Sequence, residues 1–292
     1  MATQQLSRVN FLHPNTLAKT DRATLWVRRI IGLWGLLGAG LVAAQEPSMD
    51  DGWRLLSRYL YRDAGEVFAQ AQDADRRLVD FGRAAGLLNE PPVTAGKVRQ
   101  AEKLLQNVIA GESQDEVAAY ARYLLARIAH MHRNAPLAEV ETAYRAVIEP
   151  APSGAAAQLA ASHLALVLLY QRPDLAVPER IAAAQALAPV AAAELLPDVA
   201  VAFYRSLAEA ALYYGRVDAQ VVDWLRQAHA IGSSDELLQI SLSLQIAETA
   251  RATGRREVAI NHYREFLARA VPTDQRYETA KLRLRQVEEG AQ

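Results

Sequence analysis

The fold is decided by the stretch AETARATGRREVAINHYREFLARAVP, residues 247–272. Its apolar side chains recur at intervals of three and four residues, glycine interrupts the pattern at position 254, and proline follows at position 272. This pattern is typical of two amphipathic helices joined by a turn. The stretch therefore predicts an antiparallel helix pair.

Six positions of this pair have a characteristic spacing: Ala247, Gly254, Ala259, Tyr263, Phe266 and Pro272. The spacing resembles that of the tetratricopeptide repeat, although the proline falls one residue later than the family pattern. In that family the small residue lets the two helices pack closely and the glycine makes the turn. The alanine and the aromatic residue of the second helix fill the seam between them.

Other segments repeat this second-helix signature less exactly. They contain Ala64, Phe68 and Ala71; Ala101, Leu105 and Val108; Val140, Tyr144 and Val147 before Pro150; and Ala210, Gly215, Val221, Leu225 and Ala228. The segment 158–190 keeps only the apolar rhythm. The resemblance implies a right-handed α-solenoid of about five or six pairs over residues 45–292, closed by a capping helix at Asp274–Glu288. An ordinary helical bundle is the alternative.

The breaks between helical segments also favour an all-α fold. Glycine, proline or short polar clusters interrupt the periodicity at 89–92, 111–113, 150–154, 172–178, 232–234 and 272–274. No segment alternates with period two over the length of a strand. Alanine-rich runs such as Ala155–Ala161 and Ile181–Leu187 have high helix propensity. We therefore expect helices only.

Residues 1–44 have the order of charges and apolar residues of an export signal. Arg28 and Arg29 precede an uncharged run of 15 residues, Ile30–Ala44, and acidic residues follow. The run is shorter than the roughly 20 residues that span a bilayer. We expect cleavage after Ala44 or retention as an amino-terminal membrane anchor.

This signal places the repeat domain outside the cytoplasm, either in the periplasm or anchored in the inner membrane. Twin-arginine export is a weaker match. A start at Met49 is the alternative, because it would remove the signal and leave a cytoplasmic regulator.

Composition argues against several functions. The formal net charge is −1 and the chain has no cysteine, so neither an extended basic surface for nucleic acid nor thiol chemistry is expected. No phosphate-binding glycine motif occurs. The six histidines form no recognised motif, and His130 and His132 are two residues apart, on different faces of a helix. We expect no catalytic, cofactor or metal site, and hence a protein that is not an enzyme.

The resemblance implies a binding face as well, because the first helices of successive tetratricopeptide pairs line a concave surface. Projected onto this sequence, that face consists of Arg76, Arg83, Tyr120, Tyr123, Arg127, His130, Arg205, Glu209, Tyr213, Glu248 and Arg251. Arginine and tyrosine carry much of the binding energy at protein interfaces.

The sequence thus predicts a non-catalytic scaffold of the bacterial cell envelope that binds a protein or peptide partner in a groove. The alternative is a glycan-gripping module similar to the non-catalytic helical part of peptidoglycan lytic transglycosylases.

Overall fold

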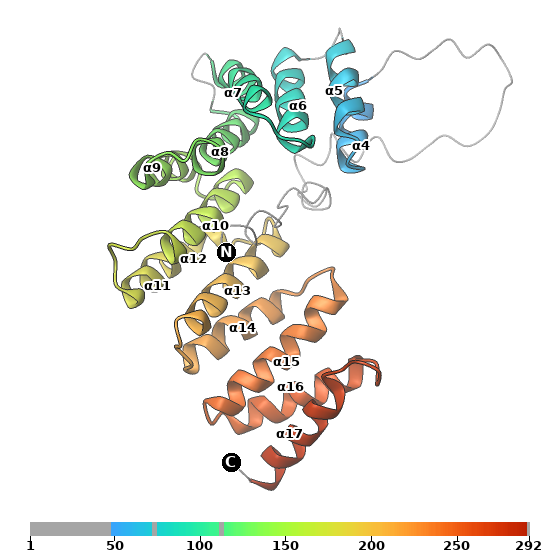
Figure 1. The fold of residues 1–292 in the computed structure, drawn as a ribbon, viewed down its shortest axis with the longest axis vertical. Helices are drawn as coiled ribbons and strands as arrows, with labels where there is room; N and C mark the ends of the chain where they lie inside the picture. Colours follow the sequence, from blue (N-terminus) through green and yellow to red (C-terminus); the bar gives the residue numbers. More distant parts are fainter. Residues whose placement is uncertain (1–47, 72–74, 111–113, 291–292) are drawn as a thin grey trace, which may run out of the picture. The chain divides into compact units, whose positions relative to one another are not determined.

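The computed structural model describes residues 48–71, 75–110 and 114–290, which contain helices joined by turns and loops and no strand (Figure 1). The expected signal or anchor at 1–44 lies outside them. The prediction of an all-α fold is confirmed for the described part of the chain. Its 14 helices are α4 (Met49–Ser57), α5 (Tyr61–Gln70), α6 (Arg76–Asn89), α7 (Ala95–Ile109), α8 (Glu116–Met131), α9 (Leu137–Ile148), α10 (Ala155–Tyr170), α11 (Val177–Gln185), α12 (Ala188–Ala191), α13 (Pro197–Tyr213), α14 (Ala219–Ile231), α15 (Glu236–Ala252), α16 (Arg256–Arg269) and α17 (Tyr277–Glu289).

Several helices begin where a side chain satisfies the free backbone N–H groups of the first turn. Ser48 and Asp51 form a reciprocal capping box at the start of α4. Asp115, Asp218 and Asp235 accept backbone hydrogen bonds at the starts of α8, α14 and α15.

The helix ends differ from the sequence expectation in three places. Pro178 lies inside the first turn of α11, where a missing N–H costs nothing. The last helix begins at Tyr277, after a turn that Asp274 stabilises. Tyr59, with φ of 64°, separates α4 from α5 without any glycine or proline to mark the break.

The chain divides into two compact units, residues 1–160 and 161–292. In the first unit, each helix from α4 to α9 packs on the next, and α4, α6 and α8 also contact one another in turn. Phe68 of α5 is fully buried between glycines of two neighbouring helices. A Cβ atom would lie 2.4 Å from the Phe68 ring if added to Gly52 and 2.7 Å from it if added to Gly82.

In the second unit, the helices from α13 to α17 also pack in succession. The residues that carry the repeat resemblance lie as expected in the α15–α16 pair: Ala247, Ala259, Tyr263 and Phe266 are all 0% exposed. Gly254 joins the two helices with φ of 72°, a left-handed conformation that glycine adopts without strain.

Two side-chain bonds of the second unit, each between one helix and the turn before the next helix but one, join residues at the same sequence distance. Ser233, before α15, donates to Asp198 of α13 at 3.3 Å, and Arg276, before α17, donates to Ser241 of α15 at 3.1 Å. Each bond joins residues 35 positions apart. This distance matches helix pairs with a length in the mid-thirties.

No helix in the described ranges is both long and apolar enough to cross a membrane.

Candidate functional site

The projected face begins, in the first unit, with residues that differ widely in exposure. Arg76 is exposed and its Nε lies 3.3 Å from Asp80 Oδ1, while Arg83 is half-buried. Tyr120 is half-buried against Phe81, with ring centroids 6.4 Å apart, and burial raises the pKa of its hydroxyl. These side chains contribute polar tips to an otherwise packed helix surface.

Tyr123 is part of the core, because its side chain is only 1% exposed and burial raises its pKa to about 12. The guanidinium of Arg127 lies 5.9 Å from the centroid of its ring. His130 Nδ1 lies 3.2 Å from the hydroxyl of Tyr144 on α9. Because Tyr123 has almost no exposed surface, it is not available to a partner, and its projection onto the binding face was wrong.

In the second unit, three projected residues lie together on α13. Arg205, Glu209 and Tyr213 follow one another at intervals of four, so they share one face of the helix. Arg205 donates to Glu209 Oε1 at 2.8 Å, and the side chain of Tyr213 is 74% exposed. These three residues and Tyr170 of α10 are called the α13 patch.

Two further aromatic rings hold Tyr213 in place. Its ring centroid lies 6.4 Å from that of Tyr170 and 5.1 Å from that of Tyr214. Tyr214 donates to the carbonyl of Leu169 at 2.9 Å, and Arg180 lies over its ring at 5.8 Å. Burial, with the charge of Glu209, raises the pKa of Tyr170 to about 12. The patch therefore presents an exposed aromatic ring on a fixed support.

The last two projected residues, Glu248 and Arg251, lie at the end of α15. Glu248 accepts a hydrogen bond from Tyr263 of α16 at 2.9 Å and forms an ion pair with Arg283 of α17. Arg251 lies 3.6 Å from the same carboxylate. Glu248 thus joins three helices and is already engaged within the domain.

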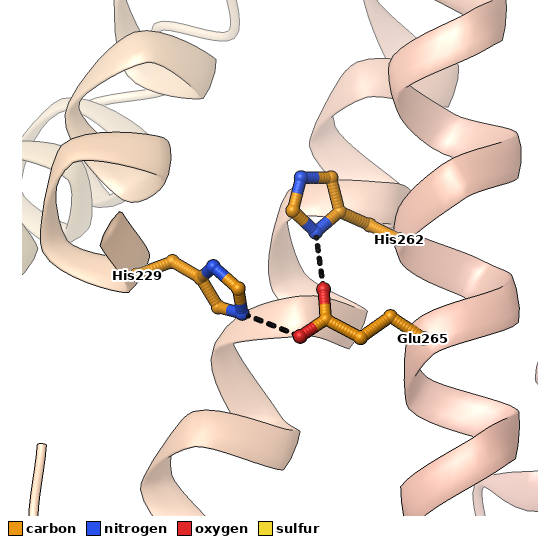
Figure 2. Close-up of side chains that lie close together, drawn as sticks. All are labelled: His229, His262 and Glu265. Carbon is orange, nitrogen blue, oxygen red and sulfur yellow. Dashed lines mark hydrogen bonds and ion pairs between the residues drawn. The ribbon is translucent and has the colours of Figure 1, made fainter. Parts of the chain in front are cut away.

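A cluster that the sequence analysis did not identify joins α14 to α16 (Figure 2). His229 of α14 lies with Nε2 2.9 Å from Glu265 Oε1, and His262 lies with Nδ1 3.2 Å from Glu265 Oε2. One ligand-type atom from each residue lies within 4.8 Å of the others. Burial is the main cause that lowers the pKa of His262, and the nearby His229 is the second cause. The lower pKa favours the neutral form of the His262 imidazole.

One signal for this cluster was present in the sequence. His262 and Glu265 are three residues apart, which places them on one face of a helix. The partner, His229, lies 36 positions before Glu265, and only the packing of α14 beside α16 brings it close.

Comparison with known proteins adds no family to this description. No protein-family model matches the chain, and a search of curated proteins also finds no match. The class that the structure itself defines is a helical protein whose helices pack one after another.

Proposed function

We propose that the protein is a non-catalytic scaffold that binds a protein or peptide partner through the α13 patch. The observation that carries this proposal is Tyr213, which is 74% exposed and yet supported by two aromatic rings. A tyrosine held in one position offers a large contact area at little cost in conformational entropy.

The neighbouring charges suit the recognition of a polypeptide. Arg205 presents a planar set of N–H donors, and Glu209 presents a carboxylate. They lie eight and four residues before Tyr213, respectively, on the same face of α13, and both are accessible. An arginine pairs bidentately with carboxylates, and a mixed pair of charges selects a partner of complementary pattern. Such a mixture of arginine, tyrosine and acid fits a peptide better than a sugar.

The proposed architecture is a tetratricopeptide-like α-solenoid. Its support is the left-handed glycine at the turn, the buried seam of α15 and α16, and the bonds that recur at 35 residues. In such arrays every second helix contributes to the same surface. The helices two places before and after α13 would therefore extend the patch.

The proposed location is the cell envelope, with residues 1–44 as a cleaved signal or an anchor. The capping box of α4 supports this reading, because Ser48 caps the start of that helix. Cleavage after Ala44 leaves Ser48 in place, whereas a start at Met49 would remove the cap.

The test is affinity purification from envelope fractions with the wild type and with the variant R205A/E209A/Y213A. The matched control, R285A/E278A/Y277A, removes the same residue types from α17. We expect at least one partner protein to be recovered with both the wild type and the control. The patch variant should recover at least about tenfold less of that partner. Partners that bind all three proteins equally would contradict the role of the patch, provided that circular dichroism shows all three folded.

The exposed Tyr213 also motivates a direct test of glycan binding, since sugars stack on aromatic rings. We expect the protein not to sediment with purified peptidoglycan. Sedimentation that the Tyr213→Ala substitution abolishes would replace the peptide proposal with the glycan one.

A further inference from the structure

Three side chains able to bind metal converge between α14 and α16 (Figure 2). Their side chains are 19% exposed for His229, 16% for His262 and 30% for Glu265, so an ion from solvent can reach them. His262 Nδ1 is buried and has no aligned hydrogen-bond partner among the described residues, although Glu265 is near.

We propose that His229, His262 and Glu265 bind a divalent first-row transition metal ion, for which Zn²⁺ is the natural test. The ligand atoms are His229 Nε2, His262 Nδ1 and one carboxylate oxygen of Glu265. The proposal concerns the second unit alone and is independent of any partner at the α13 patch.

The distances suit such an ion. Zinc binds imidazole nitrogen and carboxylate oxygen at about 2.0–2.2 Å, so tetrahedral ligand atoms lie about 3.4 Å apart. The three ligand atoms here all lie within 4.8 Å of one another. His229 Nε2 lies 2.9 Å from Glu265 Oε1, and His262 Nδ1 lies 3.2 Å from the other carboxylate oxygen, Oε2. Side-chain rotations that change the distances between ligand atoms by at most about 1.4 Å would therefore bring the three atoms to tetrahedral spacing.

The ligand set selects the type of ion. Two imidazoles and one carboxylate suit Zn²⁺, Ni²⁺, Co²⁺ and Cu²⁺, whereas Ca²⁺ and Mg²⁺ prefer oxygen ligands throughout. Three protein ligands leave further positions of the ion for water. The ion would take the place of the hydrogen atom between His229 Nε2 and Glu265, so binding requires deprotonated ligands.

The surroundings of the cluster include one neutral oxygen, from Ser243, and one positive charge, from Arg269. The buried Ser243 of α15 donates to the carbonyl of Gln239 at 3.1 Å, which leaves its oxygen free to accept, and this oxygen lies 3.2 Å from His229 Nε2. Arg269 places its Nη1 3.5 Å from Glu265 Oε1. Because this positive charge competes with a cation for the same carboxylate, its removal should tighten metal binding.

The experiment titrates the full-length, chelator-stripped protein with Zn²⁺ by calorimetry, and with Co²⁺ by visible absorption. We expect calorimetry to give a stoichiometry of one ion per chain. The visible absorption bands of bound Co²⁺ should indicate nitrogen ligands in a site of low symmetry. His229→Ala, His262→Ala and Glu265→Gln should each weaken binding by at least about tenfold, whereas Arg269→Ala should strengthen it several-fold.

Two matched controls keep the site intact. His132→Ala removes an exposed histidine outside the cluster, and Glu257→Gln removes an exposed acid from α16 itself; both should bind as the wild type does. A second readout is thermal unfolding, because an ion that joins α14 to α16 raises Tm by roughly 5–10 °C at a hundredfold excess over Kd.

The proposal is overturned if the wild type binds no stoichiometric ion, or if the cluster variants and the controls bind equally. It is also overturned if Arg269→Ala weakens binding, since the ion would then not lie beside the Glu265 carboxylate that Arg269 contacts. Each variant must first give the wild-type circular dichroism spectrum without metal. Where His262→Ala fails this check, the near-isosteric Glu265→Gln decides.

Discussion

At the scale of single residues, the ring of Phe68 leaves no room for a side chain at two glycines of the first unit, Gly52 and Gly82. A methyl group on Gly82 would lie 2.7 Å from the Phe68 ring, and nothing lies within 4 Å of a methyl group on Gly65. We expect Gly82→Ala to lower the free energy of unfolding by about 1–3 kcal/mol through overpacking.

Gly65→Ala is the control on the neighbouring helix, and should raise the stability by about 0.5–1 kcal/mol through helix propensity. Urea unfolding of the two variants measures both effects. Equal stability of Gly82→Ala and the wild type would show that Phe68 is not held between the glycines.

A second residue-scale prediction concerns Asp274. Its carboxylate accepts hydrogen bonds from the Arg276 side chain and backbone at 2.7–3.0 Å, and these lower its pKa to about 2. Since the pKa in the folded state is below that of the unfolded chain, the contribution to stability is present above pH 3.9 or so and is lost as the pH falls through about 2.

Carboxyl-detected NMR titration should therefore give Asp274 an abnormally low pKa, and Arg276→Ala should raise it toward the ordinary value. An ordinary pKa in the wild type would contradict the ion pair.

At the same scale, the sequence predicted buried seam residues better than surface residues. The resemblance to the tetratricopeptide repeat implied that Tyr263 and Phe266 lie in the seam, and both are 0% exposed. Tyr123 was projected onto the face but is 1% exposed. The burial of a seam residue follows from its position in the helix pair, whereas the exposure of a half-polar side chain depends on which neighbour covers it.

At the scale of elements, the α15–α16 pair depends on its turn. Gly254 has φ of 72° and nothing lies within 4 Å of an added Cβ, so strain in the backbone is the only cost of a side chain there. We expect Gly254→Ala to destabilise the protein by about 1–2 kcal/mol. Gly254→Asn should cost less, because asparagine tolerates this conformation. Equal effects of alanine and asparagine on the urea midpoint would contradict the strain argument.

The metal-ligating cluster shows why a site formed between elements was missed. His262 and Glu265 share one helix, so their proximity is visible in the sequence. His229 enters only because α14 lies beside α16, a contact between residues 36 positions apart. No sequence motif relates residues 36 positions apart, so the contact could not be predicted before the packing of the helices was known.

At the scale of the whole molecule, the solenoid and the ordinary bundle differ in size. A compact chain of about 250 residues has a radius of gyration of about 18 Å. A solenoid adds its units along one direction, so residues 45–292 should have a clearly larger value in small-angle X-ray scattering, with a long tail in the pair-distance distribution. A value near 18 Å would favour the bundle.

The scaffold proposal makes its most direct claim about Tyr213. The measurement is site-specific photocrosslinking in living cells, with a photoreactive phenylalanine analogue at position 213 or, as a control, at the exposed Gln227 of α14. The account predicts a discrete protein adduct at position 213 and none at position 227. The absence of an adduct at 213, or the same adducts at both positions, would contradict it.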